Sequence, residues 1–507
     1  MKMKNSNIGK LISNFGSRIW SLVSVFIFVP LYIHYLGIEN YAIIGFYTLI
    51  LGIISFADAG MSSAVIREFS HDNTALYKYS VLRKVENLYW TICICISLIL
   101  IFSSNLIAEK WLHTENIPIE RLAYFIKLIG IGVPIQLVSS LYYGALFGLN
   151  EQVRANSYQI LWNIARAALV IILFIVFKPS LEIYFIWQII CNLIYIIALR
   201  FSIIRILSQA ENKLRNILDR IPKSILSYVG GMTLIAVISA VNSQADKIIT
   251  SSFFPLKVYG FYNIASLLAQ IPVIIATPLA MFVFPLFSKF SSKEEDIEKL
   301  NICFEKISFI LNMLIFPAVI LLIIYAKEII LLWAGKSIDD AILPDIVFVL
   351  RMLAIGSLFL ALQFPFYYLL LSKGKTKYTI YQGVVQILIG IPLLYFCAKH
   401  YGLRGIGLPW ILINLGSFIY LCIICFSKYI NLNYKKFFIY YILLPFFITA
   451  IICVLINYFY KINNELYFLI YIILSGILCI VFPLVIHNIK EKINLFNYKE
   501  IFNFPNN

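Results

Sequence analysis

Long apolar segments recur along the whole chain and are separated by short polar stretches. A helix needs roughly 20 predominantly apolar residues to cross a bilayer, and the pattern supplies about fourteen such segments. The predicted membrane-spanning helices cover residues 12–36, 41–66, 86–107, 122–148, 156–177, 182–203, 224–252, 258–287, 305–326, 346–371, 378–398, 405–427, 437–459 and 465–487. The sequence therefore predicts an all-α integral membrane protein.

The positively charged residues fall mainly on alternate sides of these predicted helices. With the N-terminus placed in the cytoplasm, the inside segments hold 27 Lys and Arg residues and the outside segments hold 9. Cytoplasmic loops of membrane proteins carry such an excess of Lys and Arg. Both termini are therefore expected in the cytoplasm.

Two stretches of the chain repeat one another. YLGIENYAIIGFYTLI (35–50) matches FFPLKVYGFYNIASLL (253–268) in its pattern, so that Tyr41 and Ala42 pair with Tyr259 and Gly260. We expect an N-terminal six-helix bundle (1–206), an amphipathic cytoplasmic linker (207–223) and a second six-helix bundle (224–430). Two additional helices and a cytoplasmic tail follow (431–507). The bundles are expected to be related by a pseudo-two-fold axis along the membrane normal.

Several prolines lie inside the predicted spans. A proline in a helix interior removes a hydrogen bond and clashes with the preceding turn, so kinks are expected at these positions. They are Pro30, Pro134, Pro272, Pro278, Pro317, Pro365 and Pro392.

Composition supports the membrane class and excludes several functions. The chain is 61% hydrophobic and 13% charged, whereas soluble domains are about 45–50% apolar and about 25% charged. The net charge of +16 is explained by the inside loops and does not indicate nucleic-acid binding. The nine cysteines lie almost all in apolar runs and the five histidines are scattered, so no disulfide framework or metal site is expected.

The segment SKGKTK (372–377) contains a Gly-Lys-Thr fragment. A phosphate-binding loop needs a glycine five positions before the second glycine, and position 369 is Leu. We therefore expect no nucleotide-hydrolysing domain, no catalytic residues and no cofactor.

A few charged residues lie inside predicted spans, where each costs at least about 2.5–3.5 kcal/mol. Such residues usually face a bundle interior or a wet cavity. Arg166 is expected near mid-membrane. Arg18 can snorkel to the cytoplasmic face, and Lys127 and Arg351 can snorkel outward. The complete set is Arg18, Lys127, Arg166, Lys247 and Arg351, with the acids Asp58 and Asp246.

These embedded charges sum to a positive surplus. A cavity with that surplus favours an anionic ligand, and phosphate suits arginine because bidentate hydrogen bonds form readily. A bare carboxylate would repel such a ligand. Asp58 and Asp246 are therefore expected to act as counter-ions to the bases or as titrating groups in coupling to H⁺ or Na⁺.

Two motifs carry a family resemblance. RIWSLVSVFIFVPLYIHYLGIENYAIIGFYTLI (18–50) and FADAGMSSAVIRE (56–68) resemble the opening helices of the polysaccharide transport family, in particular the Wzx-type O-antigen flippases. That family belongs to the superfamily of multidrug, oligosaccharidyl-lipid and polysaccharide exporters. By this resemblance Arg18, Asp58, Arg67, Arg166 and Lys247 are candidate cavity residues. The repeat does not duplicate the carboxylate, because the position equivalent to Asp58 is Ala276.

The resemblance implies a flippase rather than an enzyme. Its expected substrate is a polyprenyl (undecaprenyl) diphosphate-linked oligosaccharide, an O-antigen or other polysaccharide repeat unit, carried across the bacterial inner membrane by alternating access. The expected drive is the membrane potential or an ion gradient. A polysaccharide polymerase and a chain-length regulator are candidate partners.

Two other functions stay open at this point. A cation-coupled drug exporter would favour embedded acids, whereas this chain favours embedded bases. A membrane-embedded glycosyltransferase or polymerase would place acidic pairs or large domains in outside loops, and here Asp339–Asp340 is an isolated pair.

Overall fold

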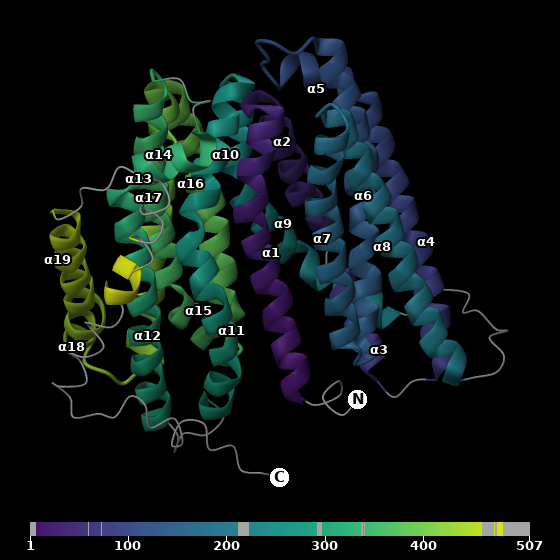
Figure 1. The fold of residues 1–507 in the computed structure, drawn as a ribbon. Helices are drawn as coiled ribbons and strands as arrows, with labels where there is room; N and C mark the ends of the chain where they lie inside the picture. The colour runs from purple at the N-terminus through teal and green to yellow at the C-terminus, as the bar shows by residue number, and fades with distance from the viewer. Residues whose placement is uncertain are drawn as a thin grey trace. The chain divides into compact units, whose positions relative to one another are not determined.

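The chain is all-helical throughout the part that the structure describes. The computed structural model describes residues 7–58, 60–71, 74–210, 223–291, 297–335, 338, 340–458, 471 and 474–479 (Figure 1). No β-strand occurs among them, and ten described helices are long and apolar enough to span a membrane. The predicted fold class is thereby confirmed. Most of the predicted linker, most of the span at 465–487 and the C-terminal tail lie outside the described residues.

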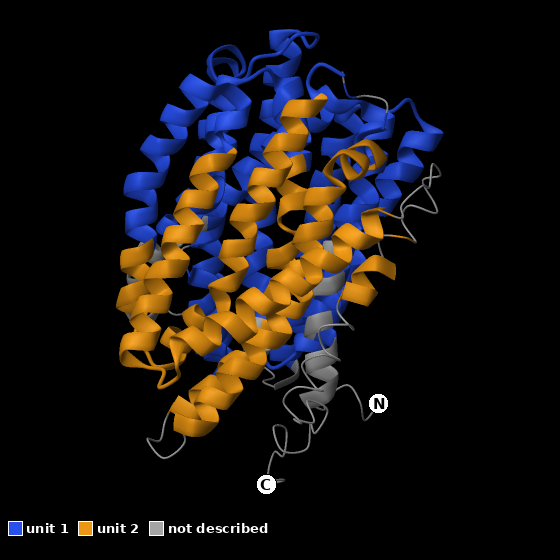
Figure 2. Cartoon of the chain, turned by 90° about the vertical axis from the view of Figure 1, so that its left-hand side faces the viewer, with its two compact units in different colours: residues 1–264, 333–342, 383–406 blue, residues 265–332, 343–382, 407–507 orange. Residues whose placement is uncertain are grey.

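The helices fall into two compact units, coloured separately in Figure 2. Unit 1 comprises residues 1–264, 333–342 and 383–406, and unit 2 comprises 265–332, 343–382 and 407–507. The boundaries predicted for two bundles and a C-terminal pair stay a prediction. The elements are α1 (Asn7–Leu36), α2 (Ile38–Ile54), η2 (Ser55–Asp58), α3 (Met61–Ser70), α4 (Ala75–Phe102), α5 (Ser104–Lys110), α6 (Ile119–Gly148), α7 (Gln152–Val176), α8 (Leu181–Ala210), α9 (Lys223–Phe253), α10 (Leu256–Ala269), α11 (Ile271–Ser291), α12 (Ile297–Ile324), α13 (Ala326–Ala334), α14 (Leu343–Leu362), α15 (Phe364–Ser372), α16 (Thr376–Gly405), α17 (Gly407–Lys428), α18 (Tyr434–Phe437), η5 (Phe438–Leu443) and α19 (Leu444–Tyr458).

Helix α6 is the central helix of unit 1. It packs against α3, α4, α5 and α8, while α1 packs along α7. Polar bonds join the latter pair: Ser17 Oγ donates to Asn156 Oδ1 at 3.2 Å, and Asn163 Nδ2 donates to Ser21 Oγ at 3.0 Å. Side-chain hydrogen bonds between helices are a normal means of association inside a membrane.

The two repeated sequence stretches meet in unit 1. A Cβ atom added at Gly260 on α10 would lie 2.8 Å from the Ile38 backbone oxygen and 3.1 Å from Ala42 Cβ on α2. Ala42 and Gly260 are the positions that the repeat pairs. Equivalent positions that touch one another are expected beside a two-fold axis, so this contact supports the internal repeat. The small residues allow the two backbones to approach closely.

The predicted single helix at 41–66 is interrupted, and the expectation of one continuous span there is wrong. Helix α2 ends at Ile54, a 3-10 turn follows at Ser55–Asp58, and α3 begins at Met61. Gly60 adopts a left-handed conformation with φ +78°, which only glycine adopts without steric cost. Ser55 Oγ also bonds to the Gly52 carbonyl at 2.6 Å. Because the segment is apolar throughout, its hydropathy alone does not predict this interruption.

Two further predicted spans are each divided at a proline. The span at 258–287 becomes α10 and α11, with Pro272 in the first turn of α11, and that at 346–371 becomes α14 and α15, with Pro365 in the first turn of α15. A helix start tolerates proline because its first amides have no intrahelical acceptor. At Pro30, Pro134, Pro278, Pro317 and Pro392 the helix continues through the proline.

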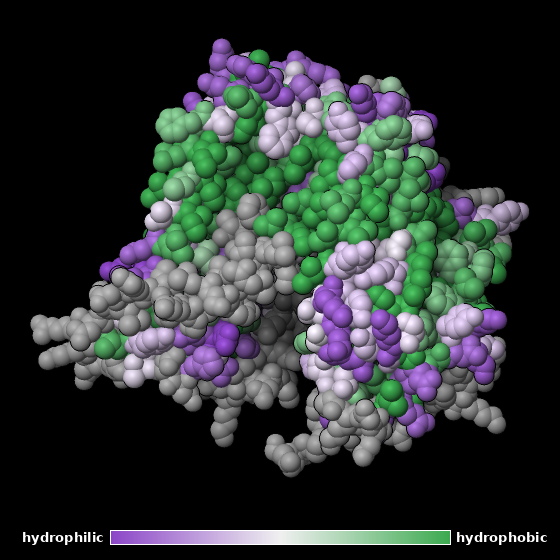
Figure 3. Space-filling model, turned by 180° about the vertical axis from the view of Figure 1, so that it is seen from behind, coloured by the Kyte–Doolittle hydropathy of each residue, from purple (hydrophilic) through white to green (hydrophobic). Residues whose placement is uncertain are grey.

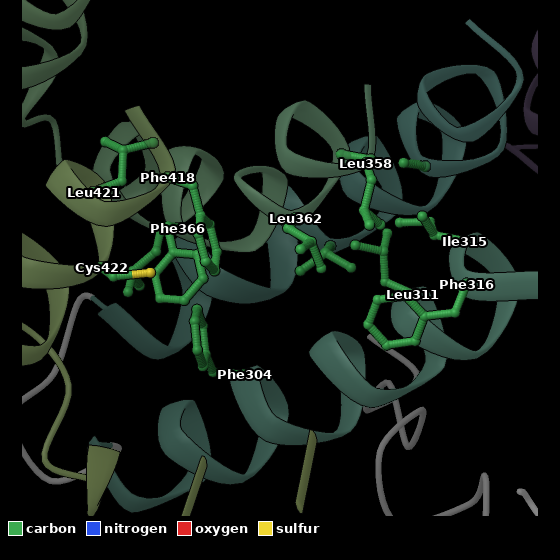
Figure 4. Packing of buried hydrophobic residues seen from close by; sticks show 14 of the residues in the cluster. Phe304, Leu311, Ile315, Phe316, Leu358, Leu362, Phe366, Phe418, Leu421 and Cys422 are labelled. Atoms are coloured by element: carbon green, nitrogen blue, oxygen red, sulfur yellow. The ribbon is translucent and has the colours of Figure 1, made fainter. Parts of the chain in front are cut away.

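Unit 2 is organised around an aromatic core. Phe366 of α15 lies edge-on to Phe304 of α12, with ring centroids 5.0 Å apart, and to Phe418 of α17 at 5.9 Å (Figure 4). Aliphatic residues of α12 and α14 complete this cluster, including Leu311 and Leu362. Edge-to-face aromatic pairs add stabilisation beyond the area that they bury.

Many large apolar side chains point outward. Phe102 on α4 is 82% exposed, and similar residues lie along α7, α8, α16, α17 and α19. On the face seen in Figure 3, hydrophobic residues cover a broad central area. A soluble monomer rarely exposes so much apolar surface, so this surface is suited to lipid.

We predict that Gly260→Ala lowers the apparent unfolding temperature of the purified protein. The added methyl group meets the backbone oxygen of Ile38, which cannot move aside as a side chain would, and overpacking costs about 1–3 kcal/mol. The matched control is Gly416→Ala on α17, because nothing lies within 4 Å of a Cβ atom there. Equal unfolding temperatures for the two variants would contradict the close packing of α2 and α10.

Candidate functional site

A stripe of polar groups runs along one face of α6. Gly132, Gln136, Ser140 and Tyr143 are spaced by four, four and three residues, which places them on one side of a helix. Each of them bonds to a different neighbour: Asn192 to the Gly132 carbonyl, Arg166 to Gln136, Asp58 to Ser140, and Tyr143 to Asn156. We call these four positions the α6 stripe. It brings polar groups from several helices of unit 1 to a single surface.

Arg166 lies beside the α6 stripe. Its Nη1 donates to Gln136 Oε1 at 3.4 Å, and the same oxygen accepts from Tyr47 Oη at 2.7 Å. The guanidinium carbon lies 4.4 Å from the ring centroid of Trp162, a cation–π distance. No carboxylate pairs with Arg166 among the described residues. The guanidinium is thus positioned by neutral groups, and its charge is not neutralised by them.

Asp58 bonds to Ser140 of the α6 stripe, one helical turn beyond Gln136. Ser140 Oγ donates to Asp58 Oδ1 at 3.1 Å, Ser62 Oγ donates to Oδ2 at 2.6 Å, and Tyr89 Oη also donates to Oδ1. The Ser62 backbone N–H, in the first turn of α3, lies 3.4 Å from Oδ1. A carboxylate is favourable at a helix N-terminus because it complements the positive end of the helix dipole. In the described part of the chain, its hydrogen-bond donors are all uncharged.

Asp246 on α9 has a similar environment. Tyr262 Oη of α10 donates to Asp246 Oδ2 at 2.6 Å. The neighbouring Lys247 forms no hydrogen bond or ion pair within the described part, and its side chain is half-buried. Helix α9 packs against α2, η2 and α3, so its polar residues belong to the same group of elements as Asp58. Both embedded acids are therefore hydrogen-bonded by a tyrosine of a neighbouring helix.

The remaining candidates lie elsewhere. Arg67 and Lys127 are exposed on α3 and α6, respectively. Arg351 is exposed in unit 2 and donates from Nε to the Ile323 carbonyl at 3.0 Å. The backbone of Arg18 lies on α1, and its side chain is outside the described part. The structure thus gathers Arg166, Asp58, Asp246 and Lys247 on packed elements of unit 1.

An ion pair with a buried carboxylate was not predicted from the sequence. Arg200 Nε of α8 donates to Glu86 Oε1 of α4 at 2.7 Å, and Tyr142 Oη of α6 donates to the same oxygen at 2.7 Å. The Glu86 side chain is only 8% exposed. Positive-inside counting assigned Arg200 to a cytoplasmic loop, and Glu86 coincides with the predicted start of a span. These residues tie together three helices of unit 1.

No group of three or more His, Cys, Asp or Glu side chains that could hold a metal ion occurs within the described ranges. The described cysteines are free thiols, almost all buried.

Comparison with solved structures shows that the chain shares its fold with multi-helix membrane proteins. The lipid II flippase MurJ in an inward closed conformation matches with a TM-score of 0.72 and 20% identity, over 96% of this chain and 99% of that one. An inward-facing multidrug resistance transporter of the MATE family matches with a TM-score of 0.62 and 15% identity, over 83% and 94%.

Sequence comparison gives the family. Residues 10–291 match the family model described as polysaccharide biosynthesis protein, and the chain belongs to this family. A putative O-antigen transporter of Shigella flexneri is 22% identical over 386 residues, 74% of this chain and 87% of the relative. The lipopolysaccharide biosynthesis protein WzxC of Escherichia coli K12 is 23% identical over 224 residues, 44% of each chain.

These matches confirm the resemblance to polysaccharide transporters that the opening motifs indicated. The relatives that these names describe by activity are transporters and flippases rather than enzymes, in agreement with the expectation that the chain is not an enzyme.

We predict that Glu86→Ala destabilises unit 1. Removing the carboxylate leaves Arg200 without its charged partner and Tyr142 without its acceptor, and breaking a buried pair costs about 3–5 kcal/mol. Because Arg200 is one-third exposed, this pair is only partly buried, and the expected loss is about 1.5–3 kcal/mol, the range for a hydrogen bond to a charged group. Glu86→Gln should lose less, since its amide oxygen still accepts a hydrogen bond.

The measurement is the apparent unfolding temperature of the purified protein. The control is Glu109→Ala on α5, where the side chain is exposed and the expected change is within about 0.5 kcal/mol. Similar effects at Glu86 and Glu109 would show that the pair contributes little.

Proposed function

We propose that this protein is a flippase of the bacterial inner membrane that moves polyprenyl diphosphate-linked oligosaccharides from the cytoplasmic to the outer face by alternating access. Membership of the polysaccharide biosynthesis family, the name of the Shigella relative and the likeness to the MurJ fold support this proposal. Both termini are placed in the cytoplasm on the basis of the loop charges. The lipid tail stays in the bilayer while the diphosphate and glycan cross.

Arg166 carries the proposal, as the residue that recognises the diphosphate. A cation inside a membrane-spanning segment usually has a partner, and no carboxylate lies beside the half-buried Arg166 among the described residues. Trp162 and Gln136 hold its position but leave guanidinium donors available. A diphosphate is the group that would complete this arrangement, because an arginine fork matches phosphate oxygens geometrically. Lys247 is proposed as a second cation of the same site.

Asp58 and Asp246 are proposed to couple transport to an ion. Each accepts a tyrosine hydroxyl, and Asp58 accepts two serine hydroxyls in addition. Oxygen-rich surroundings of this kind suit H⁺ exchange or Na⁺ binding. The membrane potential would add about 2.3 kcal/mol per charge per 100 mV in expelling an anion from the negative interior. A polymerase and a chain-length regulator would act on the product outside.

A drug exporter of the MATE type is the second candidate, favoured by that fold likeness and by the two hydroxyl-bonded acids. The unpaired Arg166 supports the flippase, because cationic drugs would be repelled by it. Transport that requires a lipid-linked sugar and does not accept cationic dyes would support the flippase over the drug exporter.

We predict that Arg166→Gln lowers the rate of translocation about 10- to 100-fold, the range expected for losing charge-assisted hydrogen bonds to a phosphate. The measurement is flipping of a fluorescent polyprenyl diphosphate sugar in vesicles containing the purified protein. Arg166→Lys should retain part of the activity.

Arg121→Gln is the matched control, since it removes an arginine of α6 that is exposed and paired with Glu182 at 3.1 Å. If the Arg166→Gln variant is expressed and folded normally and flips the substrate at the wild-type rate, the proposed role of Arg166 in substrate binding is wrong.

We predict that Asp58→Asn abolishes the dependence of transport on the ion gradient. The amide keeps one acceptor oxygen for the hydroxyls but has neither the charge nor a titrating proton. Flipping is measured with and without a pH or Na⁺ gradient. If Asp58 serves only to hold α3 and α6, the variant will respond to the gradient as wild type does. Ser62→Ala, which removes one donor but no charge, is the control.

A further inference from the structure

Lysine and tyrosine side chains gather at one end of unit 2. Lys428 Nζ lies 3.2 Å from Tyr378 Oη and 5.4 Å from the centroid of that ring, while Lys377 Nζ lies 5.2 Å from the same centroid. Lys373 Nζ lies 5.9 Å from the ring centroid of Tyr429. The ring centroids of Tyr378 and Tyr429 are 6.5 Å apart. We call these five residues the lysine–tyrosine cluster. It concentrates three positive charges around two aromatic rings.

Among the described residues, no ion pair joins this cluster to an acid. The sequence contains no Asp or Glu between Asp345 and Glu465. Burial, and next the positive charge of Lys375, lower the pKa of Lys373. Cation–π contacts at exposed sites are weak and offset only part of the repulsion. A bound anion would relieve it.

The cluster lies where three membrane-spanning helices reach the same surface. Helix α15 ends at Ser372, α16 begins at Thr376 and α17 ends at Lys428. One turn into α16, Tyr381 is 61% exposed and pairs with Tyr420, with ring centroids 6.1 Å apart. Exposed tyrosines next to lysines are typical of the lipid head-group level. By the loop charges this is the cytoplasmic surface.

We propose that the lysine–tyrosine cluster binds the phosphate head groups of anionic phospholipids in the cytoplasmic leaflet. Lysine suits this ligand because its ammonium group is a mobile point charge on a flexible stem, which follows a head group without fixed geometry. The tyrosines hold the ammonium groups at the interface and supply hydroxyl donors. Basic clusters between helices on the cytoplasmic side are suited to anionic lipids in this way. None of these five residues belongs to the proposed transport site of unit 1.

The test uses the full-length protein in neutral detergent, with native mass spectrometry to count bound lipids. Wild type should retain phosphatidylglycerol and release phosphatidylcholine. Replacing Lys373, Lys377 and Lys428 together by Gln should weaken phosphatidylglycerol binding roughly a hundredfold, at about fivefold per lysine. The Arg triple variant should still bind.

The matched control is the triple replacement of Lys110, Lys178 and Lys399 by Gln, which removes the same charge from exposed positions outside the cluster. If both triple variants weaken phosphatidylglycerol binding equally, the effect depends only on net charge and the proposal is wrong. Unchanged binding by the Lys373, Lys377 and Lys428 triple variant would also contradict the proposal. Inorganic diphosphate is the second probe: if it displaces phosphatidylglycerol at equal concentration, the cluster binds phosphate in solution and the lipid assignment is wrong. If the Gln triple variant does not fold, Lys428→Gln alone should show the fivefold loss.

Discussion

The need to satisfy polar groups without water governs unit 1. In hydrocarbon an unpaired polar group costs several kcal/mol, so each must find a partner inside the protein. Helix α6 supplies those partners by placing a carbonyl, an amide and two hydroxyls on one face. The neighbouring helices are held at fixed heights along it, because each bond joins a particular turn. The face of α6 that supplies these hydrogen-bond partners also positions Arg166 and Asp58.

The acid and the base along this face are held apart rather than paired. Asp58 bonds to Ser140 and Arg166 bonds to Gln136, one helical turn away, a rise of about 6 Å. A direct salt bridge would neutralise both charges and leave little affinity for an external ion. Neutral donors and acceptors between them preserve both charges in a site that membrane insertion makes expensive. This separation is consistent with the proposed roles of Arg166 in binding an anion and of Asp58 in ion coupling.

The sequence predicts the all-α membrane class well, since apolar length is a property of the chain alone, whereas the count of fourteen spans stays a prediction beside the ten found among the described residues. It predicts the interruption at Ser55–Gly60 poorly, because that break depends on one left-handed glycine and a carboxylate cap inside an apolar run. Arg166 and Asp58 could be named because charges are conspicuous in apolar segments. Their partners could not, since Gln136, Ser140 and Tyr89 are unremarkable alone. The spacing of Gln136, Ser140 and Tyr143 was the available signal.

The pairing of Glu86 with Arg200 has a consequence for how the chain is made. The two residues are 114 positions apart, and synthesis at about 5–20 residues per second separates their appearance by roughly 6 to 23 seconds. Before α8 is made, the Glu86 carboxylate of α4 lacks Arg200 and has Tyr142 of α6 and, at 4.0 Å, Arg83 as partners. The Glu86–Arg200 ion pair is therefore completed only when α8 has been made, and a chain stalled before that point leaves the Glu86 carboxylate without its closest basic partner.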